Sequence, residues 1–370
     1  MNILVIAPLP PANSILPFTG NSLPVKVLVD ELIKNNHNVE IIDLSKKSFS
    51  SGASIGRVFQ ILKILIQVFK KRKNKDIIYL TVAESFAGNI RDIFIYIICF
   101  SNLKRTIIHM LGGARMNSIL DPNNGLQFKI NKFFLSKLST IVVEGQSQFN
   151  TFLNVAQKEK INIIPNFAED FLFINESKIY EKFKEMSPLK ILFLSNMLYG
   201  KGYLELIDAY KSLPSIKRNQ ISLDFAGGFD SKKEKNCFLE KIINEKQVTY
   251  HGSVKGENKK QLYHEAHIFC LPTYYPYEGQ PFSIVEAMAA GDVIITTNHS
   301  GIGYIFKNGI NGVEVKKKSV SSLTQSLESI LSNTNQLLTF ALTNRKEANE
   351  KYTQENYLNK IMKVIINISH

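Results

Sequence analysis

The chain has 370 residues, of which 44% are hydrophobic and 21% are charged. This length is too great for one small domain and favours two, each with its own core. The composition excludes wholesale disorder, and no apolar run reaches the roughly 18–20 residues of a membrane span. The formal net charge of +13 is the unusual feature. A basic surface suits nucleic acid, an anionic membrane or a phosphorylated ligand, and composition does not choose among them.

The cellular location is expected to be cytoplasmic. Residues 1–10 have no basic start and are typical of a strand rather than a signal peptide. The three cysteines, Cys99, Cys237 and Cys270, lie far apart, so they offer neither a disulfide framework nor a metal-binding pair. A reducing compartment is consistent with this pattern.

The first part of the chain alternates strand-like and helix-like segments. Residues 2–7 are a short apolar run, as in a buried parallel strand, and a helical period at 23–36 leads to a strand at 38–44. The series continues with strands at 76–82, 105–110, 140–145 and 161–166 and a helix at 89–100. Because parallel strands need crossover connections, this order predicts a parallel sheet covered by helices.

The second part repeats the pattern after a break. Residues 167–188 have no clean period, and we expect the interdomain linker at 171–188. Strands are then predicted at 189–196, 221–228, 248–254, 266–273 and 292–297, and helices at 202–213, 231–245 and much of 319–368. The fold expected is α/β, with two doubly wound Rossmann-like domains at 1–170 and 189–350 that face each other across a cleft. A final helix at 351–370 is expected to pack back toward the N-terminal domain.

Two glutamates mark the most informative segment, YYPYEGQPFSIVEAMAAGDVIITT at 274–297. Glu278 lies in a loop, and Glu286 lies inside a helix that begins near Pro281. Ligands of such sheets bind beyond the carboxyl ends of the strands, where a helix N-terminus suits a diphosphate or a sugar hydroxyl. The apolar neighbours of Glu286 indicate burial, so its carboxylate is a candidate acceptor for the vicinal diol of a ribose. The alternative is that both glutamates are ordinary surface residues.

Two further candidates follow predicted strands. Lys201 stands at a helix start and would add positive charge against a leaving diphosphate, although a solvated lysine is the alternative. His109 ends an apolar strand, and Gly112 and Gly113 allow a ligand close to the backbone. The alternative for His109 is a structural role, and Arg115 either binds a phosphate or faces water.

Several motifs are missing. There is no Asp-x-Asp, and His264 and His267 form HExH rather than the HExxH of a zinc helix, so no metal site is expected. We expect these histidines to be satisfied by the protein or exposed. No GxGxxG follows the first strand and no GxxxxGK[ST] occurs, which disfavours a dinucleotide oxidoreductase and a P-loop NTPase.

Over nearly its whole length the sequence resembles the retaining glycosyltransferases of family 4, which have the GT-B fold. The resemblance rests on the Glu-x7-Glu segment EGQPFSIVE followed by AMAAG, on Lys201-Gly202, on IIPN at 163–166 and on NGING at 308–312. It implies transfer of a sugar from a nucleotide diphosphate sugar to an acceptor, with retention at the anomeric carbon and without a metal ion or other cofactor. A UDP-sugar is the donor expected.

The resemblance also implies a set of site residues. Glu286 would hold the donor ribose, Lys201 would neutralise the diphosphate, and His109 would sit beside the sugar and the acceptor. The implied catalytic residues are His109, Lys201 and Glu278. Other donor-binding residues implied are Gly20, Asn196, Ser253, Val254, Thr273, Gly279, Gln280, Pro281 and Phe282.

Two positions depart from the family pattern. Asn196 stands where the family often has an arginine, so the diphosphate charge would rest more on Lys201 and backbone N–H groups. Thr19 precedes Gly20 where the family has a second glycine.

Residues 57–75 hold seven basic residues, no acidic one and many apolar ones. They are either an amphipathic helix for an anionic membrane surface or a crossover helix with a solvated basic end. The resemblance implies a glycan or polyprenyl-lipid-linked acceptor, a role in surface polysaccharide synthesis (capsule, O-antigen lipopolysaccharide or exopolysaccharide) and a peripheral position on the inner face of the cytoplasmic membrane. The alternatives are another two-domain nucleotide-sugar enzyme such as an epimerase, or a membrane- or nucleic-acid-binding module, although no aromatic platform accompanies the charge.

Overall fold

The computed structural model describes residues 1–10, 22–45, 55–113 and 115–369. The chain forms two compact units. The first comprises Met1–Pro165, Tyr277–Gln280 and Glu355–His370, and the second comprises Asn166–Pro276 and Pro281–Gln354. Each unit is built on one six-stranded sheet, and all pairings between the named strands are parallel. The expected α/β class with two doubly wound domains is therefore confirmed.

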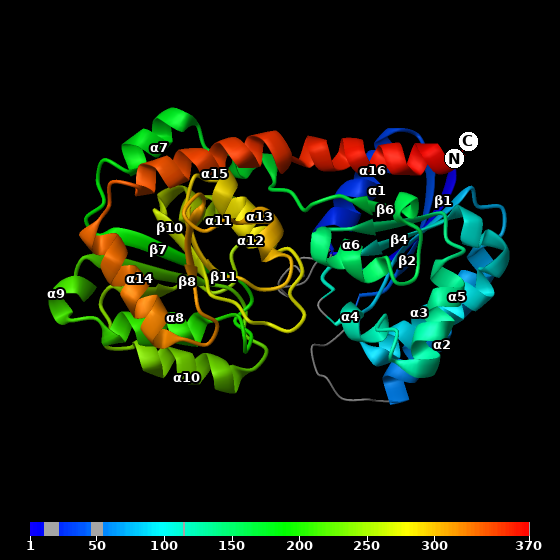
Figure 1. Ribbon diagram of the computed structural model, residues 1–370, viewed down its shortest axis with the longest axis horizontal. Coiled ribbons are helices and arrows are strands. Elements are labelled where there is room, and N and C mark those ends of the chain that lie inside the picture. Colours follow the sequence, from blue (N-terminus) through cyan, green and yellow to red (C-terminus); the bar gives the residue numbers. More distant parts are fainter. Residues whose placement is uncertain (11–21, 46–54, 114, 370) are drawn as a thin grey trace. The chain divides into compact units, whose positions relative to one another are not determined.

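The sheet of the first unit has the strand order β2-β1-β3-β4-β5-β6. Its strands are β1 (Asn2–Ala7), β2 (Asn38–Asp43), β3 (Ile77–Thr81), β4 (Thr106–Met110), β5 (Thr140–Val143) and β6 (Ile161–Ile163). Figure 1 labels the strands β1, β2, β4 and β6 of this sheet. Every residue of β3, β4 and β5 is buried, which explains why these strands are continuous apolar runs in the sequence.

Helices cover both faces of this sheet. They are α1 (Leu23–Lys34), α2 (Ile55–Lys71), α3 (Phe86–Ile98), α4 (Met116–Ile119), α5 (Gly125–Leu135), α6 (Gln146–Phe152) and α16 (Gln354–Ser369), with short 3-10 helices η1 (Phe100–Arg105) and η2 (Lys158–Lys160). The hydroxyl of Ser85 accepts the N–H of Gly88 and so caps the start of α3. α3 packs against both α2 and α5, and all three contribute to one apolar core. α16 buries Tyr357, Ile361 and Ile365, which recur at the spacing of one helix face.

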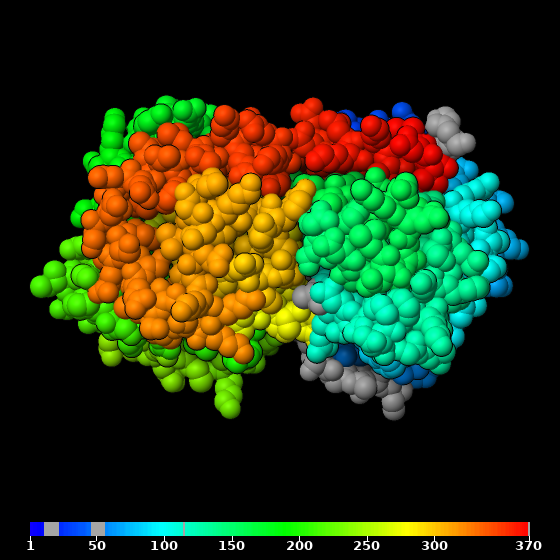
Figure 2. All heavy atoms as spheres, viewed as in Figure 1, coloured from blue at the N-terminus to red at the C-terminus, as the bar shows by residue number. Residues whose placement is uncertain are grey.

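The sheet of the second unit has the order β12-β11-β10-β7-β8-β9. Its strands are β7 (Leu189–Leu194), β8 (Ile221–Ala226), β9 (Val248–Tyr250), β10 (Ile268–Leu271), β11 (Val293–Thr297) and β12 (Gly312–Val315). Its helices are α7 (Glu176–Lys182), α8 (Tyr203–Ser212), α9 (Ser215–Arg218), α10 (Lys232–Ile242), α11 (Gly256–Glu265), α12 (Phe282–Ala289), α13 (Ile302–Ile305), α14 (Val320–Ser332) and α15 (Leu337–Lys351), with the 3-10 helix η3 (Asp170–Leu172). α14 and α15 cover much of the face of this unit that Figure 2 shows, drawn in orange to orange-red. The buried helix α12 packs between α15 and the sheet.

The expected linker at 171–188 is corrected by the structure. These residues include α7 and belong to the second unit, which begins at Asn166. Ile174 and Ile179 are buried, and the N–H of Ile174 donates to the carbonyl of Ala289 at 3.2 Å. A helix of seven residues offers too few turns for a clear period, which is why the sequence pattern did not predict it.

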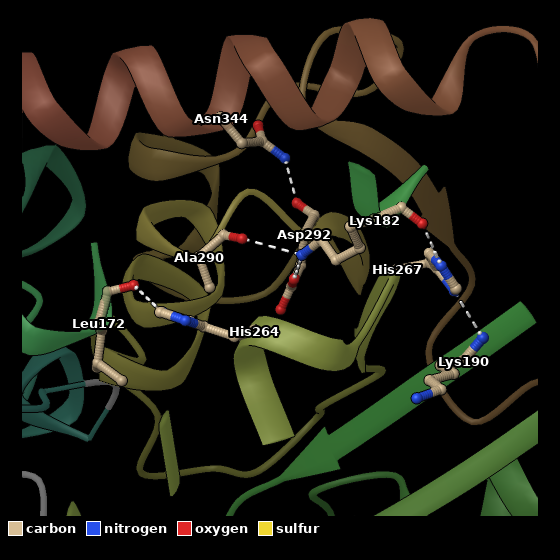
Figure 3. A network of polar contacts seen from close by, with 8 residues as sticks. All are labelled: Leu172, Lys182, Lys190, His264, His267, Ala290, Asp292 and Asn344. Atoms are coloured by element: carbon tan, nitrogen blue, oxygen red, sulfur yellow. Dashed lines mark hydrogen bonds and ion pairs between the residues drawn. The ribbon is translucent and has the colours of Figure 1, made fainter. Parts of the chain in front are cut away.

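A network of buried polar groups holds α7 in place (Figure 3). The Nζ of Lys182 lies 2.7 Å from Oδ1 of Asp292 and 2.9 Å from the carbonyl oxygen of Ala290. The amide of Asn344 on α15 donates to the backbone oxygen of Asp292 at 2.7 Å. Burial raises the pKa of Asp292 to about 7, and burial lowers the pKa of Lys182 although Asp292 opposes the shift. The network therefore ties α7 and α15 to the start of β11.

The two histidines of HExH are structural, as expected. Nδ1 of His267 accepts the N–H of Lys190 at 2.9 Å, so its hydrogen is on Nε2, which donates to the carbonyl of Lys182 at 2.9 Å. Nε2 of His264 lies 3.0 Å from the carbonyl oxygen of Leu172. Both rings are thus satisfied by backbone groups. Across the described part of the chain, no helix has the length and apolar character that crossing a bilayer requires.

Candidate active site

The loop after β7 and the segment after β10 meet at the carboxyl edge of the second sheet. β7 and β10 are neighbouring strands. The N–H of Tyr274 donates to the carbonyl of Gly200 at 2.7 Å. Gly202 has φ +87°, and a Cβ there would lie 2.5 Å from the carbonyl oxygen of Pro272. Only glycine fits this position, so the Lys201-Gly202 pair places Lys201 beside the end of β10.

Lys201 stands two residues before the first residue of α8. Its Nζ lies 4.9 Å from the centroid of the Tyr275 ring, within the range of a cation–π interaction. The N-terminus of α8 is the positive end of the helix dipole. An ammonium group and the helix N-terminus together favour an anion at this place. Asn196, in the same loop, is half-buried.

Glu286 lies in the buried face of α12, as expected from its apolar neighbours. Its Oε1 lies 2.6 Å from Nζ of Lys259, and its Oε2 accepts the hydroxyl of Tyr263 at 2.9 Å. Lys259 also contacts Glu169 at 3.1 Å. Burial alone would lower the pKa of Lys259, but Glu286 and Glu169 outweigh it and the pKa is raised. An ionised carboxyl group has roughly four acceptor positions, so these two partners leave acceptor capacity on Glu286.

Lys259 and Tyr263 were not among the residues predicted from the sequence. They stand four residues apart on α11 and so share one face of that helix. This spacing was the only sequence signal for Lys259 and Tyr263, because their partner Glu286 is distant in the sequence.

Other predicted donor-binding residues lie along this unit. Thr273 is fully buried, and its hydroxyl donates to the carbonyl of Gly200 at 3.3 Å. Pro281 precedes the first residue of α12, and the ring of Phe282 packs edge-on against Phe167 at 5.8 Å. The structure thus brings Thr273 and the Lys201 loop together.

Ser253 and Val254 follow β9 at the other end of the same edge. β7 and β8 separate β9 from β10. At the usual strand spacing, the ends of β9 and β10 are roughly 14 Å apart. The role of Ser253, Val254 and Thr273 in donor binding stays a prediction.

His109 lies within β4 and is fully buried. Burial lowers its pKa to about 3, so the imidazole is neutral at physiological pH. Its Nδ1 is hydrogen-bonded to the hydroxyl of Tyr79 on the neighbouring strand β3. In the described parts of the chain, its Nε2 has no hydrogen-bond partner.

The glycines after β4 lie beside Glu144, which follows β5. Oε2 of Glu144 accepts the N–H of Gly112 at 3.2 Å and the N–H of Gln280 at 3.1 Å. A Cβ at Gly279 would lie 2.3 Å from Oε2 of Glu144. Glu278, which directly precedes Gly279 in the chain, is also buried. Glu278, Gly279 and Gln280 therefore belong to the first unit, whereas Glu286 belongs to the second.

Glu84 is a further acidic residue at this edge that the sequence analysis did not single out. It lies just after β3, with Oε2 accepting the N–H of Arg115 at 3.2 Å. Burial raises its pKa to about 7, with the charge of Glu144 adding to the shift and the N–H groups of Arg115 and Gly113 opposing it. The guanidinium group of Arg115 packs over the ring of Tyr277 at 4.6 Å. In the sequence, only its position after a predicted strand pointed to Glu84, and this is a weak signal because Glu84 belongs to no recognisable motif.

Three predictions stay open at this point. Gly20 lies outside the described residues. Lys201 and Glu286 are in one unit and His109 is in the other, so their convergence on one ligand remains a prediction. The described part of the chain contains no group of three or more His, Cys, Asp or Glu side chains placed to hold a metal ion.

Comparison with known proteins finds similarity to glycosyltransferases. Residues 175–348 match the model of the family described as glycosyl transferases group 1. An uncharacterised glycosyltransferase of Methanocaldococcus jannaschii is 26% identical over 60% of this chain and 53% of its own length. N,N'-diacetylbacillosaminyl-diphospho-undecaprenol alpha-1,3-N-acetylgalactosaminyltransferase of Campylobacter jejuni is 26% identical over 66% of each chain. The matches thus span between about half and two thirds of these relatives.

Solved structures share the fold over the whole chain. Anabaena HepE in complex with UDP has a TM-score of 0.72 at 16% identity, covering 99% of this chain and 100% of HepE. This chain therefore shares the two-domain GT-B fold of these structures. Most of the matched residues belong to the second unit, where Lys201 and Glu286 lie.

Proposed function

We propose that the protein is a retaining glycosyltransferase of family 4 that moves a sugar from a nucleotide diphosphate sugar, with UDP as the nucleotide, to a hydroxyl group of an acceptor. One observation carries the proposal: the loop of Lys201 and the buried helix of Glu286 follow the neighbouring strands β7 and β10, inside the segment that matches the group 1 family. Ligands of doubly wound sheets bind at this edge.

The proposed chemistry follows from the charges. Departure of the diphosphate builds negative charge on its oxygens, which Lys201 and the N-termini of α8 and α12 stabilise. The sugar becomes oxocarbenium-like, and the acceptor hydroxyl attacks from the face that the diphosphate leaves. The departing phosphate oxygen takes the proton of the acceptor, so no side-chain nucleophile is assigned. Glu286 accepts hydrogen bonds from the ribose, and Glu278 and residues 279–282 hold the sugar or the phosphate.

The donor is tested by thermal unfolding of the full chain with UDP-, GDP- and ADP-sugars. A nucleotide sugar that binds the native state raises the melting temperature, because binding stabilises that state by RT ln(1 + [L]/Kd). We expect a UDP-sugar to give the largest shift. No shift with any of the three would contradict the donor assignment.

The reaction is tested by product analysis with and without an acceptor. A retaining transferase gives a new glycoside with the anomeric configuration of the donor, and it gives it only with the acceptor. Conversion of the donor into an isomeric nucleotide sugar without acceptor would instead identify an epimerase.

We also propose a lipid-linked glycan as the acceptor, in surface polysaccharide synthesis at the inner face of the cytoplasmic membrane. The similar C. jejuni enzyme is named for an undecaprenol-linked acceptor. In the first unit, α2, α3, η1 and α5 expose many large apolar side chains: Val58, Phe59, Leu62, Ile66, Phe69, Phe86, Ile90, Phe94, Ile97, Phe100, Leu126 and Phe133. We call these residues the apolar face. A contiguous exposed apolar surface marks an interaction site.

The charges around the apolar face favour an anionic membrane over another partner. The charged residues of α2, α3, η1 and α5 are basic except Asp92, which is buried and paired with Arg91 at 2.6 Å. Each basic residue near an anionic surface contributes about 1 kcal/mol. Neutralising Lys70, Lys71, Arg72 and Lys73 should therefore release the protein from phosphatidylserine vesicles in sedimentation. Unchanged sedimentation would contradict the membrane proposal.

A further inference from the structure

His109 carries a buried nitrogen that needs a hydrogen-bond partner. Buried polar atoms are nearly always paired, and Nε2 of this ring is not paired within the described residues. The ring is neutral, so one nitrogen carries the hydrogen and the other accepts. The tautomer therefore decides what kind of group Nε2 binds.

The bond between Nδ1 of His109 and the hydroxyl of Tyr79 runs in one of two directions. If Tyr79 donates, Nε2 carries the hydrogen and is a donor. If Nδ1–H donates, Nε2 has a lone pair and is an acceptor. The direction depends on where the hydroxyl hydrogen of Tyr79 goes.

The contacts of Tyr357 on α16 favour one of these directions. Its hydroxyl is hydrogen-bonded to the hydroxyl of Tyr79 and lies 3.4 Å from the carbonyl oxygen of Pro24. A carbonyl only accepts, so the hydrogen of Tyr357 points to Pro24 and the Tyr357 oxygen accepts from Tyr79. The Tyr79 oxygen then accepts from Nδ1–H of His109. All three side chains are buried, so bulk water does not compete for the hydrogen bonds of the relay.

We propose that Tyr79 and Tyr357 are positioning residues that keep the hydrogen of His109 on Nδ1, so that Nε2 presents a lone pair to a sugar hydroxyl. The assignment of the sugar rests on the proposed function, and His109 lies at the carboxyl end of β4, where ligands bind in such sheets. An ionised phosphate offers no hydrogen to this lone pair, so the partner of Nε2 is a hydroxyl rather than the diphosphate.

The tautomer is read directly by NMR of full-length protein labelled with ¹⁵N-histidine. Two-bond ¹⁵N–¹H correlations distinguish a protonated from an unprotonated ring nitrogen, and His109→Gln identifies the signals. We expect the hydrogen on Nδ1 in the wild type. Hydrogen on Nε2 in the wild type would overturn the proposal without any variant.

Tyr357→Phe tests the relay itself. Without the Tyr357 hydroxyl, the hydrogen of Tyr79 is released to Nδ1, and we expect it to switch the ring to the Nε2–H tautomer. The matched control is Tyr96→Phe, which removes the hydroxyl of another buried tyrosine of the same unit that packs against Phe134. The control should leave the tautomer unchanged. An unchanged tautomer in Tyr357→Phe would overturn the relay.

Kinetics separate this proposal from the proposed function. Turning an acceptor into a donor removes one hydrogen bond and leaves a buried group unsatisfied, so kcat of Tyr357→Phe should fall about tenfold to hundredfold, with the KM for the nucleotide sugar little changed. A switched tautomer with unchanged kcat would overturn the role of Nε2. Absence of transfer in the wild type would overturn the proposed function and leave the tautomer result standing.

Discussion

Lys259 lies 2.6 Å from Glu286 and so ties the face of α11 to the buried acid of α12. The side chains of Lys259 and Glu286 are 14% and 5% exposed. Tyr263, one turn further along α11, donates to the other oxygen of the same carboxyl group. The orientation of Glu286 is therefore set by α11 before any ligand binds.

Lys259→Met should destabilise the protein, because it leaves a buried acid with one neutral partner. Breaking a buried pair typically costs about 3–5 kcal/mol, and we expect the lower end because Lys259 is partly exposed. The measurement is the free energy of unfolding in urea. The control is Lys260→Met, since Lys260 pairs with a Glu257 that is largely exposed, and it should change the free energy by less than about 0.5 kcal/mol. Equal effects of the two changes would show that the buried pair contributes nothing measurable.

Lys201→Ala should abolish transfer and leave the fold intact. Removing a group that stabilises transition-state charge costs about 10²–10³ in kcat. The measurement is the initial rate with the donor identified by thermal unfolding, together with the melting temperature. Lys211→Ala is the control, because Lys211 lies in the last turn of the same helix and its Nζ is 3.6 Å from the carboxylate of Glu245. Near-normal turnover of Lys201→Ala would contradict the site assignment.

Glu286→Gln is expected to abolish transfer as well. It is a better test than Glu286→Ala, because glutamine keeps the size of the side chain and one oxygen that accepts hydrogen bonds, whereas alanine would leave both Lys259 and Tyr263 without this acceptor. Rates are compared at a temperature where circular dichroism shows the variant folded. Full activity of folded Glu286→Gln would exclude an ionised carboxyl group at the ribose.

The sequence predicted the strands well, because buried parallel strands are apolar at every position. β1 has the bounds predicted, and β3, β4 and β10 lie within the segments expected. β12 was missed, since it has four residues, begins with Gly312 and exposes Glu314. Gly312 is needed because a Cβ there would lie 2.0 Å from the carbonyl oxygen of Ile294. Close packing of the β12 backbone against β11 leaves no alternation of apolar and polar residues in the sequence, so the strand could not be predicted.

The candidate residues were predictable where a motif carries them, and their partners were not. Glu286 and Lys201 stand in recognisable segments. Tyr79 meets His109 only because β3 and β4 pair with Thr81 opposite His109. A register of this kind depends on the packing of the whole sheet, so no local pattern reveals it.

Glu84→Gln should remove a pH dependence near 7. The pKa of Glu84 is about 7 chiefly because the group is buried, so the carboxyl group is neutral at pH 6 and ionised at pH 8. If an acceptor hydroxyl donates to the ionised form, the KM for the acceptor falls as pH rises through 7. The measurement is that KM between pH 5.5 and 8.5 in wild type and Glu84→Gln. Glu159→Gln, an exposed acid of the same unit, should keep the wild-type profile, and a flat profile in the wild type would exclude Glu84 from acceptor binding.

Lys182→Met should cost more stability at pH 8 than at pH 5. Asp292 has a folded pKa of about 7, raised by burial from 3.8, so the folded state holds a proton that the unfolded state releases. This group's contribution to the free energy of unfolding therefore falls as pH rises from about 4 to 7. Without Lys182 the pKa of Asp292 rises further, so at pH 8 the folded state must take up a proton that the unfolded state does not hold, and this costs stability. Urea unfolding at both pH values measures the difference.

The double change Lys182→Met with Asp292→Leu is the control for this pair. It removes the buried acid together with its partner, and such replacements are often neutral or stabilising. We expect the double variant to regain stability at pH 8 relative to Lys182→Met and to lose the extra pH dependence. An equal cost of Lys182→Met at both pH values would show that Asp292 does not titrate in this range.

Replacing Phe59 and Phe94 by serine should weaken vesicle binding without unfolding the protein. These side chains of the apolar face are 68% and 48% exposed, so the folded state loses little when they are shortened. Inserting a phenylalanine into a bilayer interface buries apolar area worth roughly 1.5–3 kcal/mol at full burial, so losing both should reduce partitioning at least about tenfold. The measurement is sedimentation with phosphatidylserine vesicles. Ile216→Ser with Ile243→Ser is the control, since both residues are more than 70% exposed but lie in the second unit. Equal partitioning of the two double variants would contradict docking through the apolar face, because exposure alone would then explain any loss.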